Sequence, residues 1–324
     1  MAGAGPEDAR GASPLKTAAA RLAQLAATVL VTWFVASRAG LQLSQVARLD
    51  LTGWTPRWGV LLLSCLLLSC GYFASGVLWG RITSGLGSPS MPPAVAVRLF
   101  MIANLGRYVP GKVWQIAGLA ALARERGVPA PTATAAAIVG QGISVASALL
   151  VGMGAVWTLG AGEAWRWSVP VALFGGIALG LVPAVFDALA DTWFRLARTP
   201  RPDGLTSAQA FGWLVLGLAS WVVYASAFWL LVEGLGLEAD YLSTAPAFAA
   251  AYVLGYLMIF APAGIGVREG FLIALLSPQL GASNAGAIAV IARVWTTLVE
   301  VAPAAAFWAG HLASSRQGRG QRGG

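Results

Sequence analysis

The sequence predicts an all-α protein, a polytopic bundle of about seven or eight transmembrane helices that includes re-entrant or broken helices. Hydrophobic residues make up 57% of the 324 residues and charged residues only 10%, whereas a soluble domain carries roughly 25% charged residues. The mean hydropathy is +0.71. Several apolar runs approach the ~20 residues that cross a bilayer. Too little polar surface remains to enclose a soluble helical core, so that class is excluded.

The expected elements follow the apolar runs. Residues 1–17 are rich in Ala, Gly and Pro and are expected to be a disordered tail, 18–312 a single membrane domain, and 313–324 a disordered basic tail. Trp and Tyr cluster near several run ends, where amphipathic rings favour the headgroup level. The long apolar runs are 20–37, 58–80, 131–158, 167–186, 211–232, 244–261 and 284–310.

Two stretches are too broken for a clean span and too apolar for a soluble loop. In the first, short helical runs at 94–103 and 113–123 flank Pro110-Gly111. Each is about half a membrane thickness long at 1.5 Å per residue, which favours a re-entrant hairpin. In the second, 262–280, a Gly-rich start leads into a short helix that is expected to stop at Pro278. The recurring order of parts is either an inverted repeat of the transporter type or chance.

The net charge of +8 lies mainly in loops and tails, so it sets orientation in the membrane and gives no reason to expect a nucleic-acid partner. Basic residues are concentrated in 81–126 and 195–201, and acidic residues in 233–240. Because positive loops stay in the cytoplasm, we expect a cytoplasmic N-terminus and a multi-pass protein of the cell (inner) membrane. Eight crossings would keep the basic C-terminus in the cytoplasm as well.

The first break carries the residues of a candidate anion site. Arg107 and Lys112 flank Pro110-Gly111, and the helix that restarts there directs free N–H groups toward its own beginning. A lipid phosphate is the natural ligand for such a group of donors. Further hydrogen bonds are expected from Asn104, Tyr108 and Gln115. Alternatively, Arg107 and Lys112 extend to the cytoplasmic interface and only orient the protein.

The second break carries the residues of a candidate gate. Gly264 and Gly266 allow close backbone approach, and Arg268 adds a further cation for an anionic headgroup. Glu269 either caps the helix or forms a gating ion pair with Arg268 or Arg293.

Three further polar residues lie inside apolar runs. Arg293 and Glu300 are seven residues apart and therefore share a helix face, but they are too distant to pair easily. We expect both to face the bundle interior. Gln141, between Gly140 and Gly142, favours close helix packing over cavity lining.

Catalytic signatures are absent from the sequence. A single histidine, His311, permits neither His-based catalysis nor a His-containing metal cluster, and the spacing of Cys65 and Cys70 fits no metal site or disulfide framework. The Gly-Lys pair at 111–112 lacks the rest of a phosphate-binding loop, and no Gly-x-Ser-x-Gly occurs. We therefore predict no catalytic residue, no metal, no cofactor and no enzymatic activity.

The motifs resemble those of the flippase-like family related to the transmembrane region of lysylphosphatidylglycerol synthases. The matching residues are Asn104-Leu-Gly-Arg-Tyr-Val-Pro-Gly-Lys112 with Arg124 and Gly127 after it, Pro262-Ala-Gly-Ile-Gly-Val-Arg-Glu269, and Arg293. The resemblance implies a bacterial or archaeal membrane protein of about eight helices with re-entrant elements. The soluble aminoacyl-transfer domain of the bifunctional synthases is not expected here, so their lysyl-transfer activity is not carried over.

The function that this resemblance implies is translocation of a lipid or a lipid-linked intermediate. The expected partner is an anionic phospholipid or a polyprenyl-phosphate-linked lipid, whose headgroup would enter a polar cavity between the two breaks. Glu269, Arg293 and Glu300 would form its gating ion pairs. Two alternatives are a non-catalytic partner of a cell-envelope glycosyltransferase or lipid-modifying enzyme, and an intramembrane transferase.

Overall fold

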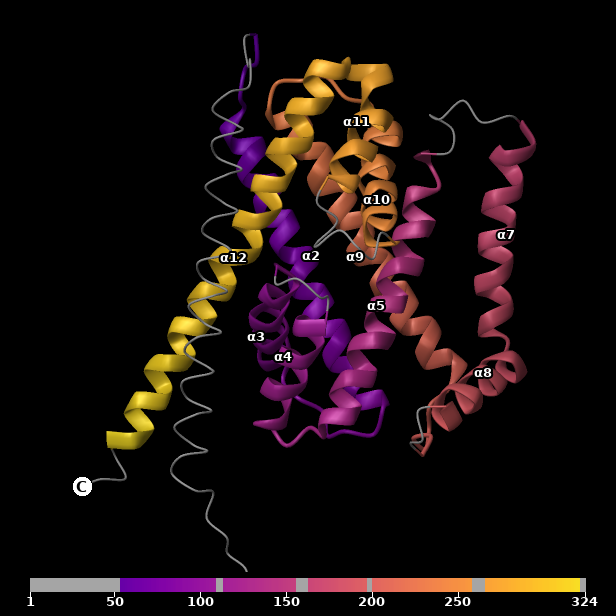
Figure 1. Ribbon diagram of the computed structural model, residues 1–324, viewed down its shortest axis with the longest axis vertical. Helices are drawn as coiled ribbons and strands as arrows, with labels where there is room; N and C mark the ends of the chain where they lie inside the picture. Colours follow the sequence, from indigo (N-terminus) through magenta and orange to yellow (C-terminus); the bar gives the residue numbers. More distant parts are fainter. Residues whose placement is uncertain (1–52, 109–112, 156–162, 197–199, 258–265, 321–324) are drawn as a thin grey trace, which may run out of the picture.

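The computed structural model describes residues 53–108, 113–155, 163–196, 200–257 and 266–320, and within these ranges it is all-helical (Figure 1). This confirms the predicted fold class. The elements are α2 (Trp58–Gly85), α3 (Pro93–Asn104), the 3-10 turn η1 (Leu105–Tyr108), α4 (Val113–Arg124), α5 (Ala130–Gly152), α7 (Glu163–Leu181), α8 (Pro183–Leu196), α9 (Ser207–Gly234), α10 (Tyr241–Leu257), α11 (Val267–Leu280) and α12 (Ala282–Gly320).

The predicted count of seven or eight spans is not confirmed. Four described helices are long and apolar enough to cross a membrane, namely α2, α5, α9 and the Ala282–Phe307 part of α12, and a bent pair makes up to five. The short helices α3 and α4 have 12 residues each, and α11 has 14. At 1.5 Å per residue, each reaches only about 18–21 Å and cannot cross alone. The expected span at 20–37 lies outside the described residues.

The apolar run 167–186, expected to be one span, is broken instead. Helices α7 and α8 meet at an angle of 78° between Leu181 and Pro183. Pro183 has no N–H and its ring crowds the preceding turn, so the first helix ends before it and a new one begins there. Figure 1 shows α7 standing apart from the main bundle, with α8 turned across its lower end.

The rest of the molecule consists of two halves with the same order of parts. α2, α3, α4 and α5 form the first half, and α9, α10, α11 and α12 form the second (Figure 1). In each, a long helix is followed by two short helices around a break and then by another long helix. The halves run in opposite directions, because Arg57 before α2 bonds Glu233 at the end of α9, and Gly85 at the end of α2 packs on Trp213 near the start of α9. The antiparallel α2 and α9, together with the shared order of parts, favour the inverted repeat over chance.

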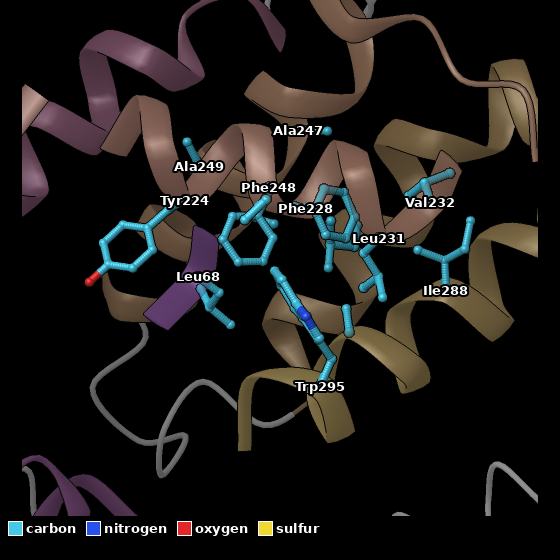
Figure 2. Packing of buried hydrophobic residues seen from close by; sticks show 14 of the residues in the cluster. Leu68, Tyr224, Phe228, Leu231, Val232, Ala247, Phe248, Ala249, Ile288 and Trp295 are labelled. Carbon is cyan, nitrogen blue, oxygen red and sulfur yellow. The ribbon is translucent and has the colours of Figure 1, made fainter. Parts of the chain in front are cut away.

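A buried aromatic cluster joins the second half to α2 (Figure 2). The rings of Phe228 and Phe248 stack at 4.7 Å between centroids, and Trp295 meets Phe248 edge-on at 6.1 Å. Leu68 of α2 completes the contact at 1% exposure. This cluster holds α9, α10 and α12 together and lies beside the start of α11, because Arg268 packs over the Phe248 ring.

The short helices match the predicted runs 94–103 and 113–123 closely, and the 3-10 turn packs against the start of α4. A Cβ placed on Gly106 would lie 2.7 Å from the backbone nitrogen of Gln115, so only glycine permits this approach. The expected stop at Pro278 is wrong by two residues, because α11 continues to Leu280 and ends at Gly281 with φ of 78°. Helix α12 continues through the backbone of 313–320, within the range expected to be a disordered tail.

Candidate functional site

A cavity of about 200 Å³ with both polar and apolar lining residues lies between the two halves, and the ends of both broken segments reach it. The first half contributes Asn104 and Arg107 from before its break and Gln115 from after it. The second contributes Gly255 and Tyr256 from before its break and Arg268 from after it. The other polar and aromatic lining residues are Tyr72, Ser75, Trp79, Phe100, Gln141, Ser144, Trp221, Tyr224, Phe248, Tyr252 and Thr296.

Arg268 brings a nearly buried cation to this cavity. It is the second residue of α11 and is 6% exposed. Its Nε and Nη2 have no hydrogen-bond partner among the described residues. The guanidinium carbon lies 4.8 Å from the centre of the Phe248 ring, and a Cβ on Gly255 would lie 3.0 Å from the Cβ of Arg268. Close packing of α10 on α11 and the Phe248 ring therefore hold this side chain in place. Its Nε and Nη2 remain available as hydrogen-bond donors.

Arg107 also reaches the cavity, but a carboxylate compensates its charge. Arg107 Nη1 donates to Glu300 Oε1 at 2.5 Å, and the hydroxyl of Tyr108 donates to Glu300 Oε2. Glu300 is 2% exposed, so both of its oxygens are satisfied inside the protein. A buried ion pair with additional hydrogen bonds is stable to the extent that all its members stay together. The η1 turn and α12 are therefore locked to each other across the two halves.

Neutral polar side chains complete the first half of the cavity. Gln115 Nε2 donates to Asn104 Oδ1 at 2.9 Å, which links the helices on either side of the first break. Gln141 of α5 lines the cavity and donates to the hydroxyl of Tyr252 at 3.3 Å. Its expected role in helix packing is therefore the weaker of the two interpretations, because a Cβ added to the neighbouring Gly142 would meet no described atom within 4 Å.

Glu269 makes both of the contacts considered for it. Its Oε2 accepts from the backbone N–H of Gly266 at 2.7 Å, which caps the start of α11. Its Oε1 lies 3.6 Å from Arg293 Nη1, so the expected contact between these residues is present. Gly266 adopts φ of 84°, a conformation that L side chains rarely take. The glycine and the carboxylate together set the direction in which α11 leaves the break.

Four of the expected site residues, Pro110, Gly111, Lys112 and Gly264, lie outside the described residues. The described ones divide into three groups. Asn104, Arg107, Gln115 and Arg268 line the cavity. Tyr108 and Glu300 form the ion-pair lock with Arg107, and Gly266, Glu269 and Arg293 form the cap and ion pair of α11.

Sequence reasoning missed two features of the site. The partner of Glu300 is Arg107, 193 positions away. No local sequence pattern predicts a contact between residues so far apart. The aromatic lining from α2, α9 and α10 was also missed, because Tyr and Trp inside apolar runs look like ordinary core or interface residues. The signal that was present is the repeated placement of tyrosine near small residues, as at Tyr72 beside Gly71.

The fold and the cavity define an integral, multi-pass helical membrane protein with charged and polar groups inside its bundle. The family model of the lysylphosphatidylglycerol synthase TM region matches residues 21–304. That match covers well over half of the chain, so the protein belongs to this family, as its motifs indicated. No curated protein and no solved structure matches the chain significantly.

Proposed function

We propose that this protein is a lipid translocase that holds an anionic headgroup in the intramembrane cavity and moves it between leaflets without changing it chemically. The observation that carries the proposal is Arg268, a cation that is 6% exposed and lines the cavity. Two of its donor nitrogens have no partner in the described part of the chain. Intramembrane ions of this kind are costly and mark substrate pathways by default.

The charge balance of the cavity favours an anion. Arg107 and Arg268 are among its described lining residues, and those residues include neither Asp nor Glu. Glu300 compensates Arg107, which leaves Arg268 as the group that a phosphate would neutralise. Because Arg268 lies in the first turn of α11, the dipole of that helix adds to the attraction. Asn104 and Gln115 would donate further hydrogen bonds.

The architecture favours movement over static binding. Two antiparallel halves built around broken helices are the arrangement in which transporters expose a central site alternately to either side. Arg107–Glu300 joins the two halves and would be the contact that opens as one half moves against the other. Glu269–Arg293 lies within the second half and would change as α11 moves against α12. The lipid tails would stay in the bilayer while only the headgroup enters the cavity.

The distribution of charge gives the orientation of the protein in the membrane. Arg81, Arg124 and Arg195 lie at one end of the bundle, near the end of α2, the end of α4 and the end of α8, whereas Glu233 lies at the other end. By the positive-inside rule we place the basic end in the cytoplasm of a bacterial or archaeal inner membrane. Since α12 runs toward that end, we place the C-terminus there too (Figure 1).

Reconstitution tests the proposal. The full chain is placed in liposomes with a fluorescent phosphatidylglycerol, and dithionite quenching reports the label that reaches the outer leaflet. Wild type and Arg126→Gln, an exposed arginine outside the cavity, are expected to move the lipid at similar rates. Arg268→Gln is expected to reduce the rate at least about tenfold. Equal rates for all three proteins, or no movement of any anionic lipid while the chain co-purifies with an envelope enzyme, would overturn the proposal.

A further inference from the structure

The cavity has an aromatic wall, which we define as Tyr72, Trp221, Tyr224, Tyr252 and Tyr256. Trp221 lies 4.6 Å from Tyr252 and 5.3 Å from Tyr224 between ring centroids, and Tyr224 lies 5.3 Å from Tyr72. Tyr252 and Tyr256 stack on each other at 6.2 Å. Tyr72, Trp221 and Tyr224 also belong to the buried core. A phosphate needs none of these rings, so the wall is available to contact a second part of a ligand beside the anion.

The charge of the cavity decides what that second part is. Aromatic faces attract cations such as an ammonium group. Here an ammonium would share the cavity with the guanidinium group of Arg268, since Glu300 already compensates Arg107. The described lining residues contain no carboxylate to balance a second cation. Like charges in a site of low dielectric repel strongly. A lysyl or other cationic headgroup is therefore disfavoured.

A candidate that fits both the rings and the polar side chains of the cavity is a neutral ring with hydroxyl groups. The negative face of an aromatic ring also attracts the weakly positive C–H groups on one face of a sugar. Hydroxyls need partners that both donate and accept, and amide side chains provide both. Asn104, Gln115 and Gln141 supply such amides, and Ser75 and Ser144 supply hydroxyls at the wall.

The existing hydrogen bonds keep these groups in position and leave capacity for a ligand. Trp221 Nε1 donates to Ser144 Oγ at 3.0 Å, and the hydroxyls of Ser75 and Tyr224 share a hydrogen bond of 2.9 Å. Gln115 donates one N–H of its amide to Asn104, and an amide has a second N–H and a carbonyl oxygen besides. A sugar against the wall would find hydroxyl partners at Ser75 and Ser144 and amide partners at Asn104 and Gln115.

We infer that the headgroup is a glycosyl phosphate, with its phosphate at Arg268 and its sugar against the aromatic wall. This inference rests on the proposed function, because it assumes that Arg268 holds the anion. It names the substrate class as a phosphodiester-linked glycolipid and sets it apart from aminoacylated or other cationic lipids.

Three short phosphodiesters of equal phosphate charge test the inference. Geranyl glucosyl phosphate, geranyl methyl phosphate and geranyl 2-aminoethyl phosphate are titrated into the purified full chain, and binding is measured by microscale thermophoresis. We expect the glucosyl diester to bind about tenfold tighter than the methyl diester, which corresponds to about 1.4 kcal/mol. The aminoethyl diester is expected to bind no tighter than the methyl diester.

Variants test whether the aromatic wall causes the preference for the glucosyl diester. Tyr252→Leu should remove most of the preference for the glucosyl diester over the methyl diester, while Tyr252→Phe, which retains the ring, should keep most of that preference. Arg268→Gln should weaken all three probes. Thermal melting of each variant shows whether it is folded, and if Tyr252→Leu does not fold, the ranking of the three probes on wild type decides alone.

The outcomes separate the two proposals. Equal affinity for the glucosyl and methyl diesters, or tightest binding of the aminoethyl diester, overturns the inference even where Arg268→Gln weakens binding and the anion site stands. If no probe binds, or if Arg268→Gln changes nothing, the anion site itself is wrong and the inference is overturned with it.

Discussion

The two halves of the molecule each place an arginine next to a broken segment, but they treat its charge differently. Arg107 of the first half is paired with Glu300 and supported by Tyr108. Arg268 of the second half has an aromatic ring beneath it and no hydrogen-bond partner at Nε or Nη2 among the described residues. A compensated buried charge holds a structure together, whereas an uncompensated one creates a demand for a ligand.

The same contrast appears at the start of the short helix that follows each break. Gln115 and Glu269 are both the third residue of their helices, α4 and α11. Gln115 makes a neutral hydrogen bond to Asn104, while Glu269 caps its helix and lies near Arg293. The contacts of Arg107 and Tyr108 with Glu300 thus connect the first break to the other half. At the second break, Arg268 lines the cavity. On this account the charge of the first break joins the two halves in the described conformation, and the charge of the second break holds the anion.

Removing the lock is the largest expected effect. Glu300→Ala leaves Arg107 and Tyr108 without their carboxylate. Loss of one partner of a buried pair costs about 3–5 kcal/mol, and we expect the low end of that range because the Arg107 side chain is 25% exposed. We expect a large drop in the melting temperature of the protein in detergent. Arg107→Met with Glu300→Met should recover much of the loss, because apolar residues of similar size can replace a buried pair. A melting temperature for Glu300→Ala equal to that of wild type would show that the first break is not locked.

The close approach at the first break is expected to give the next largest effect. A Cβ on Gly106 would lie 2.7 Å from backbone atoms of Trp114 and Gln115, and overpacking of this kind costs about 1–3 kcal/mol. Gly118→Ala is the matched control, since its Cβ would lie 3.9 Å from Ala103. Denaturant or thermal unfolding should rank Gly106→Ala clearly below Gly118→Ala, and equal stability of the two variants would contradict the packing described for η1.

The ion pair of the second break should contribute less. Arg293 and Glu269 are 3.6 Å apart, and the Glu269 side chain is 21% exposed, so screening reduces their coupling to about 1 kcal/mol. A double-mutant cycle with Arg293→Ala and Glu269→Ala, measured by melting temperature and by lipid movement, gives this coupling. Independent, additive losses would mean that the two residues do not act as a gating pair.

Arg268→Met is expected to have the smallest effect on stability and the opposite sign. It removes a buried charge whose Nε and Nη2 lack partners in the described part of the chain, so the protein should be as stable as wild type or slightly more stable. Lipid movement should nevertheless fall sharply. If Arg268→Met destabilises the protein as much as Glu300→Ala does, Arg268 belongs to the structural framework and the contrast between the halves disappears.

Local patterns predicted much of the architecture. The helical class, the two short helices around Pro110-Gly111 and the start of α11 near Gly266 followed from apolar run lengths and from Pro and Gly. The sequence also suggested an inverted repeat, but chance remained an equal alternative. The 78° bend at Pro183 was missed, because the apolar run continues through the proline without a change in composition.

The site was less predictable, for a physical reason. Arg268 and Arg107 stood out because charges inside apolar segments are rare. Which of them is compensated depends on Glu300, 193 positions from Arg107, and sequence spacing says nothing about such contacts. The aromatic wall depends in the same way on the packing of α2, α9 and α10, which brings Tyr72, Tyr224 and Tyr252 to one surface.

The most direct test of the central claim is the affinity of the full chain for dihexanoyl phosphatidylglycerol, a short anionic lipid, measured by microscale thermophoresis in detergent. Arg268→Met is compared with Arg126→Met, which removes the same charge from an exposed position. We predict that Arg268→Met weakens binding at least about tenfold and that Arg126→Met leaves it unchanged. Equal affinity of the two variants would contradict the assignment of the anion site to Arg268.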